Sequence, residues 1–270
     1  GLSSLKAVEL GGIAIEAALD RAGVAGEQVD HVVMGNVLQA GVGQIPSRQA
    51  QINGGIPKEV SSETINKVCA SGMRAVGMLD TAIRAGDIEV GVGGGMESMS
   101  NSPYLLPNAR YGYRMGDGKM IDSMINDGLT NSFSGKHMAH EASEVAAELE
   151  MTRADMDAWS VRSHQLTAKA TDEGKLPEEI VAVTIKGRKG DTVVEIDESV
   201  RPDTTLEALS KLKPIFMEDG THIYQGLTPA LARIPLLVLT DRFDGRLTGV
   251  SMILGLVAAL LLTIAQVARL

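Results

Sequence analysis

The sequence predicts an α/β fold in which a parallel sheet is covered by helices on both faces. Over residues 1–100, apolar runs of strand length alternate with segments whose apolar residues recur every three or four positions. Glycines follow the helical segments, where they commonly end a helix. Hydrophobic residues make up 44% of the 270 residues and aromatic residues only 3%, so the core is expected to be aliphatic.

The expected elements follow one another in a regular order. Ser3 or Ser4 caps a first helix, which Gly23 ends. The later elements are a strand over residues 29–37, a helix over 44–53, an extended run over 61–65, a helix that includes 75–83 and a strand over 88–92. Glycines 93–95 lack both the dinucleotide spacing and the Gly-Lys-Ser/Thr ending of phosphate-binding loops, so they are not predicted to bind phosphate. Without side chains, they are instead expected to let another backbone segment approach closely.

The composition changes after residue 100. Residues 101–136 are rich in Gly, Asn, Asp, Ser, Tyr and Met without a clear period, which is typical of a long functional insertion. A helix is expected from His137 to about residue 150. A second, capped by Thr152 with Asp155 in the capping box, is expected to about residue 174.

Side-chain type predicts which face of the second of these helices is buried. Trp159 and Leu166 are expected to face the core, whereas His164 is expected to face solvent. Two strands, over residues 179–185 and 192–196, are expected to follow and to be joined by a basic turn.

The histidine and glutamate residues at the start of the 137–150 helix form a candidate metal site. His137 and His140 stand three positions apart, with Glu141 and Glu144 nearby. This spacing is common by chance and lacks a third clear ligand, so no metal is expected.

Charge and cysteine content limit the classes of partner. The net charge of −9 argues against nucleic acid as a partner, although local Lys and Arg side chains can still bind a phosphate. A single cysteine excludes an intrachain disulfide and is typical of a reducing compartment, so a cytoplasmic location is expected. No secretory signal is evident at Gly1.

Cys69, the only cysteine, lies where an extended segment leads into a helix. The free backbone N–H groups and the positive end of the dipole at a helix start favour a thiolate. Small neighbours at 70–72 leave room for a substrate. The alternative is a buried structural cysteine, because free cysteines are among the most buried residues.

Three separated motifs favour the catalytic alternative. Asn-Lys-Val-Cys-Ala-Ser-Gly-Met-Arg at 66–74 resembles the nucleophile motif of the thiolases, the acetyl-CoA acetyltransferase family. Gly-Gly-Gly-Met-Glu-Ser-Met-Ser at 93–100 resembles the glycine-rich stretch of that family. Gly-Asn-Val-Leu-Gln-Ala-Gly at 35–41, followed by Pro-Ser-Arg-Gln-Ala at 46–50, also matches. The resemblance extends from about residue 2 to about residue 221.

The resemblance implies a thiolase-like layered α/β/α N-terminal domain with an inserted α+β loop domain. It implies an acyl intermediate on Cys69 and coenzyme A as a substrate rather than a permanent cofactor. It also implies that the coenzyme A site is lined by Leu129, His137, Met138, Arg201 and Phe216. Condensation of acetyl-CoA or the reverse thiolysis is the expected reaction, and a homo-oligomer is expected.

The domains are expected over residues 1–100, 101–216 and a divergent tail, 217–270. In the family an opening strand would precede residue 1 and a second α/β domain would follow, so the chain is expected to be incomplete. It lacks the family's second cysteine and Gly-His-Pro motif, which predicts impaired activity. The alternative is a non-catalytic remnant that binds a partner subunit or a membrane.

Residues 247–268 contain no charged residue and are long enough to span a bilayer. An out-of-frame or fused tail is the favoured interpretation. A membrane helix, or a helix packed on an exposed sheet, remains open.

Overall fold

The computed structural model describes residues 1–213 and 237–240, and its contacts divide the chain into two compact units. Of these residues, one unit contains 2–128 together with strand β8 (Leu237–Thr240), and the other contains Gly1 and 129–213. The expected domain boundary at residue 100 stays a prediction. Phe216 and the apolar segment 247–268 lie outside the described residues. Within those residues no helix is both long and apolar enough to cross a membrane.

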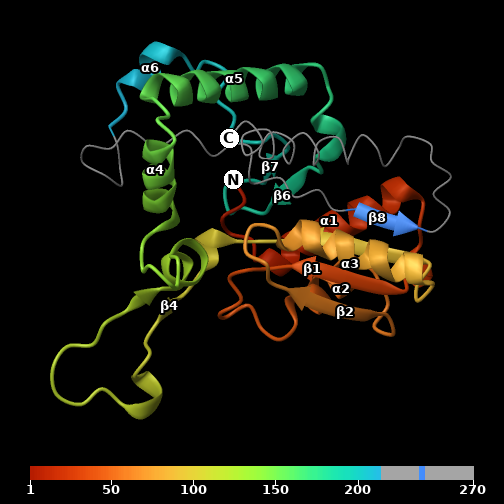
Figure 1. Ribbon diagram of the computed structural model, residues 1–270. Helices are drawn as coiled ribbons and strands as arrows, with labels where there is room; N and C mark the ends of the chain where they lie inside the picture. The colour runs from red at the N-terminus through yellow and green to blue at the C-terminus, as the bar shows by residue number, and fades with distance from the viewer. Residues whose placement is uncertain (214–236, 241–270) are drawn as a thin grey trace. The chain divides into compact units, whose positions relative to one another are not determined.

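The first unit is built around a four-stranded sheet with strand order β2-β1-β3-β8 (Figure 1). Strand β1 (His31–Gly35) pairs in parallel with β2 (Ser61–Ile65) and with β3 (Val90–Gly95), whereas β8 pairs antiparallel with β3. The parallel pairing of β1, β2 and β3 confirms the predicted α/β fold class.

Helices cover both faces of this sheet. Helices α1 (Ala7–Ala22) and α2 (Pro46–Asn53) lie on one face and α3 (Ser71–Ala85) on the other. The alternation along β1 explains the layering, because successive strand residues point to opposite faces. Val32 and Met34 join the core under α1, whereas Val33 packs with Ala75 and Leu79 of α3.

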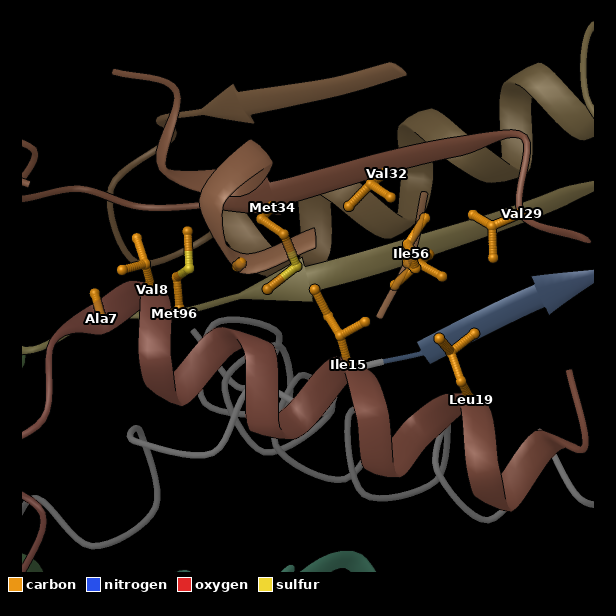
Figure 2. Close-up of a cluster of buried hydrophobic side chains, with 11 residues drawn as sticks. Ala7, Val8, Ile15, Leu19, Val29, Val32, Met34, Ile56 and Met96 are labelled. Atoms are coloured by element: carbon orange, nitrogen blue, oxygen red, sulfur yellow. The ribbon is translucent and has the colours of Figure 1, made fainter. Parts of the chain in front are cut away.

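The larger core cluster is aliphatic, as predicted. Figure 2 shows the side chains of α1 pointing toward those of the sheet. The fully or nearly fully buried members are Ala7, Val8, Ile15, Leu19, Val29, Val32, Met34, Ala50, Ile56, Val92 and Met96. Burial of such side chains contributes roughly 1.5–3 kcal/mol each for the larger residues and is the main stabilising term of the unit.

Of the two predicted ends of α1, the structure confirms one and corrects the other. Gly23 ends the helix in the left-handed conformation, with φ 64°, as predicted. The start is a correction, because α1 begins after Lys6 and neither Ser3 nor Ser4 caps it. The Lys6 backbone N–H donates to the Glu9 carboxylate at 2.7 Å, so the carboxylate in the first turn satisfies this donor instead.

The glycines at 93–95 lie inside β3, which is a second correction. The strand was expected to end at residue 92, yet it runs to Gly95. Helix α3 lies so close that a Cβ on Gly93 would stand 2.7 Å from a Leu79 methyl carbon, and one on Gly91 would stand 2.9 Å from another. Glycine is therefore the residue that lets the helix and the strand approach, although it has low strand propensity.

Residues 101–128 contain short elements, as expected for an insertion. Strands β4 (Tyr104–Leu105) and β5 (Ile121–Asp122) pair antiparallel. The remaining short helices of the described chain are η1 (Gly26–Gln28), η2 (Met99–Asn101), η3 (Ala109–Tyr111), the π-helical η4 (Met124–Leu129) and η5 (Pro177–Glu179).

The second unit contains three α-helices and a small hairpin among its described residues. The helices are α4 (Met138–Glu148), α5 (Arg153–Asp172) and α6 (Leu206–Ser210), and the hairpin joins β6 (Val183–Ile185) to β7 (Thr192–Val194). Thr152 and Asp155 form the predicted capping box of α5.

The buried face of α5 contradicts the prediction from residue type. His164 is 1% exposed, whereas Trp159 and Leu166 are 36% and 48% exposed. His164 is buried because its Nδ1 accepts a hydrogen bond from the Arg201 backbone N–H at 3.2 Å. Trp159 instead stacks at the surface against the Arg162 guanidinium, 5.0 Å from the ring centroid.

The close packing of α3 generates a stability prediction. Gly35→Ala would place its Cβ 2.5 Å from the Ser71 Cβ and 2.7 Å from the Ser71 carbonyl carbon, so the helix backbone must shift. We expect a loss of about 1–3 kcal/mol in the free energy of unfolding, measured by urea titration.

Gly77→Ala, in α3 itself, is the control. Gly77 is exposed, and its added Cβ would meet no atom within 4 Å. This substitution is expected to raise the free energy of unfolding by about 0.5–1 kcal/mol. Equal effects at the two positions would show that the approach at Gly35 is not tight.

Candidate active site

The three parallel strands end in one row. Gly35 of β1 stands opposite Ile65 of β2 and Gly95 of β3. The segments that follow them, residues 36–38, 66–70 and 96–98, therefore emerge at the same edge of the sheet. Ligands of open α/β sheets bind outside the carboxyl ends of the strands. The three motifs, which are separate in the sequence, meet at this edge.

Cys69 lies in the turn between β2 and α3, and its side chain is exposed. The structure excludes the alternative of a buried structural cysteine. Val68 precedes it with φ 50°, an unfavourable conformation for a β-branched residue that costs roughly 1–3 kcal/mol. Such strain persists only where the surroundings hold the backbone in place.

Side-chain hydrogen bonds hold this turn. The Asn66 Oδ1 accepts from the Val68 backbone N–H at 2.9 Å. The Ser71 hydroxyl accepts from the Lys67 N–H at 2.8 Å and donates to the Val68 carbonyl at 2.6 Å. Ser71 is 3% exposed and packs against Gly35, so the turn is anchored to the end of β1. The thiol is thereby presented at the start of α3.

Glu97 joins the ends of β3 and β1. Its carboxylate accepts from the Asn36 side-chain amide at 2.7 Å and from the backbone N–H groups of Val37 and Leu38 at 2.8 and 3.2 Å. Burial raises the pKa of Glu97 above its ordinary value, although the hydrogen bonds from Val37, Leu38 and Asn36 oppose this shift.

The positions of Glu97 and Asn36 in this site were not predicted from the sequence, where both stand only within motifs. Asn36 is 1% exposed, and its Oδ1 has no hydrogen-bond partner among the described residues. The available signal was their position, because a polar side chain directly after a buried parallel strand lies at the edge where ligands bind.

Four of the five expected coenzyme A residues are described, and these lie in the other compact unit. An antiparallel bridge joins Thr130 to His137, which places Leu129 and Met138 at neighbouring positions. His137 caps α4, because its Nδ1 accepts from the Ala139 N–H at 3.1 Å, and Met138 is 45% exposed. The structure thus brings three of the five residues together.

Arg201 and Phe216 are not among those three. Arg201 lies in a separate segment with its side chain exposed, and its backbone N–H donates to His164. Phe216 lies outside the described residues. The role of all five residues stays a prediction.

The acidic residues of the candidate metal site have other partners. Glu141 accepts from the Ser134 hydroxyl at 2.5 Å and from the Asn131 amide at 2.8 Å, and these bonds lower the pKa of Glu141. Glu144 pairs with Lys136 at 2.5 Å. In the part of the chain that the structure describes, no group of three or more His, Cys, Asp or Glu side chains is arranged to bind a metal.

Comparisons with known proteins agree with this architecture. The family described as "Thiolase, N-terminal domain" matches residues 1–224. The chain belongs to the thiolase family.

The thiolase relatives include acetyl-CoA acetyltransferases of two bacteria. The chain is 46% identical to the one from Syntrophomonas wolfei subsp. wolfei over 222 residues, and 49% identical to the one from Cupriavidus necator over 221 residues. Each alignment covers 82% of this chain and 56% of the relative. This chain therefore spans a little over half the length of those thiolases.

A solved thiolase structure supports the fold. The Bacillus anthracis acetyl-CoA acetyltransferase matches with a TM-score of 0.81 at 32% identity, over 89% of this chain and 61% of that structure. The similarity confirms the thiolase-like α/β fold.

The raised pKa of Glu97 generates a pH prediction. The folded state binds the Glu97 proton more tightly than the unfolded chain, whose carboxyl has an ordinary pKa near 4.5. Stability from this group is therefore complete below that value and is lost as the pH rises through the folded pKa. Relative to Glu97→Gln, the wild-type free energy of unfolding should fall as the pH rises from 4 towards neutrality, roughly the range spanned by shifted carboxyl groups.

Urea titrations of both proteins across this pH range measure the difference, in which contributions from other carboxylates cancel. A difference that is constant with pH, or that grows in favour of the wild type, would contradict the raised pKa.

Proposed function

We propose that this chain supplies the nucleophilic cysteine of a thiolase-type acyltransferase that acts on acyl-CoA. The observation that carries the proposal is the exposed Cys69 thiol on a strained, hydrogen-bonded turn at the carboxyl edge of a parallel sheet. The names of the relatives support acetyl-CoA as the substrate.

The first chemical step is a transfer of the acyl group between two sulfur atoms. The Cys69 thiolate attacks the thioester carbonyl carbon and forms a new carbon–sulfur bond. The original carbon–sulfur bond breaks, and coenzyme A leaves as a thiolate that takes up the proton released by Cys69. A thiolate suits this exchange, because it is both a strong nucleophile and a good leaving group.

The second step of a thiolase requires groups that these 270 residues do not contain. Condensation with a second acetyl-CoA needs a base that removes a proton from its α-carbon, a role that the resemblance assigns to a second cysteine. The sequence has one cysteine, and none of its five histidines lies in a Gly-His-Pro motif. The proposed contribution of this chain is therefore formation of acyl-Cys69.

The 270-residue chain should accept one acetyl group from acetyl-CoA without sustained turnover. Intact-mass spectrometry after incubation with acetyl-CoA is expected to show a single acetyl adduct that is absent in Cys69→Ala. Assay of acetoacetyl-CoA thiolysis on the same sample should show no continuing reaction.

The outcome separates the two candidate functions. Alkylation of Cys69 by iodoacetamide shows independently that the thiol is accessible. If the thiol alkylates but never acylates, the non-catalytic alternative is favoured. Robust thiolysis by the purified chain would contradict the need for further catalytic groups.

Coenzyme A is proposed to bind as a substrate along Leu129, His137, Met138, Arg201 and Phe216. The exposed Arg201 side chain provides the positive charge that a nucleotide phosphate requires. Arg201→Ala is expected to weaken coenzyme A binding about tenfold or more, as loss of a charge-assisted hydrogen bond does. Isothermal titration calorimetry measures the affinity.

Arg188→Ala is the control, because Arg188 is also exposed in the same unit but lies in the basic β6–β7 turn. A short acyl thioester without the nucleotide should bind Arg201→Ala and the wild type equally. Equal losses of coenzyme A affinity in both arginine variants would indicate a non-specific charge effect.

A homo-oligomer remains part of this proposal. Strand β2 is at the edge of the described sheet, and its backbone is available for pairing on one side. Sedimentation velocity at micromolar concentration tests it, since a monodisperse monomer would contradict self-association.

A further inference from the structure

Two carboxylates bracket the central pair of strands in the first unit. At the start of the strands, Asp30 accepts from the backbone N–H groups of Glu89 and Val90 at 2.8 and 2.9 Å. At their end, Glu97 accepts from Val37 and Leu38. The two carboxylates make the same kind of bond, but only Glu97 lies at the edge that holds Cys69.

The segment held by Glu97 is bonded in turn to the nucleophile turn. The Asn36 backbone N–H donates to the Ile65 carbonyl at 3.0 Å, and the Asn66 side-chain amide donates to the Val37 carbonyl at 3.4 Å. The same Asn66 side chain accepts from the Val68 N–H at 2.9 Å. A continuous series of hydrogen bonds therefore runs from Glu97 through residues 36–37 and Asn66 to the residue before Cys69.

Glu97 bonds the residue whose carbonyl is an acceptor for Asn66. The Asn66 Nδ2 donates to the Val37 carbonyl, and the Asn66 Oδ1 accepts from the Val68 N–H. If residues 36–38 shift, the Asn66 Nδ2 loses its acceptor, and the Asn66 Oδ1 is no longer held in the orientation that accepts from Val68. The strained Val68 conformation, with φ 50°, would then relax towards a more favourable one.

We propose that Glu97 is a positioning residue for Cys69, acting through Val37 and Asn66 to hold the turn that presents the thiol. The proposal deepens the function proposed above and rests on it, because a positioned thiol matters only for acyl transfer. Glu97 is partly buried, and burial of a charged carboxylate costs free energy unless hydrogen bonds compensate it. The bonds from Asn36, Val37 and Leu38 provide this compensation.

Amide hydrogen exchange by NMR tests the proposal without reference to catalysis. In Glu97→Ala, the Val68 amide, which donates to the Asn66 Oδ1, should exchange about tenfold faster, as loss of one hydrogen bond predicts. The Lys67 amide, which donates to the Ser71 hydroxyl, should change less. Asp30→Ala is the matched control and should accelerate exchange at Glu89 and Val90 while leaving Lys67 and Val68 at the wild-type rate.

Glu97→Gln keeps the shape and one acceptor oxygen, and should restore part of the protection at Val68. It also serves as the variant to measure if Glu97→Ala does not fold. Unchanged exchange at Val68 in both Glu97 variants would overturn the proposal. Equal acceleration at Val68 by Asp30→Ala would overturn it as well, because the effect would then be general loosening.

Chemical reactivity separates this proposal from the proposed function. Acylation by acetyl-CoA should slow about tenfold in Glu97→Ala, because misplacement of a reacting group costs one to two orders of magnitude. Alkylation by iodoacetamide, which needs only access to the thiol, should change much less. A wild type that never acylates refutes the proposed function, whereas the exchange rates still decide whether Glu97 holds the turn.

Discussion

The approach of the first turn of α3 to the end of β1 sets the position of the Cys69 thiol. Gly35 has no side chain, so Ser71 can pack directly on the strand, and the Ser71 hydroxyl then bonds both flanks of the turn. Cys69 lies between these bonded groups with its thiol exposed. The unfavourable Val68 backbone conformation depends on this packing, because a residue in such a conformation relaxes unless the surrounding structure restrains it.

The same edge of the sheet concentrates polar groups that are costly to bury. Asn36 is almost fully buried, and Glu97 keeps a partly buried carboxyl group whose pKa is raised. Elsewhere the carboxylates of the half-buried Glu144 and the exposed Glu173 have lowered pKa values, because lysine side chains bond them. The contrast agrees with the general rule that desolvated ionisable groups gather where a protein does chemistry.

The two compact units achieve burial in different ways. The first has a continuous aliphatic cluster between α1, α2 and the sheet. In the second, the buried side of α5 includes Asp157, Ser160 and His164, each with a hydrogen-bond or ionic partner. Polar residues are stable inside a protein when they are paired, so a helix can bury them and leave a tryptophan at the surface.

Local signals in the sequence determined most elements of this thiolase chain. These include the aliphatic strand residues, Gly23 at the end of α1, the Thr152–Asp155 capping box and the place of Cys69 before a helix. They were readable because the interacting residues lie within a few positions of one another. The family motifs added the thiolase family and the candidate role of Cys69.

Only the tertiary structure decided which distant groups meet. Glu97 bonds Asn36 across 61 positions, and Arg201 bonds His164 across 37, so neither the anchoring carboxylate nor the buried histidine was evident from its neighbours in the sequence. Leu79 of α3 packs against Gly91 and Gly93 of β3, and this packing favours glycine at strand positions where its own propensity is low. Propensity and capping act along the chain, whereas burial and polar pairing depend on which segments pack together.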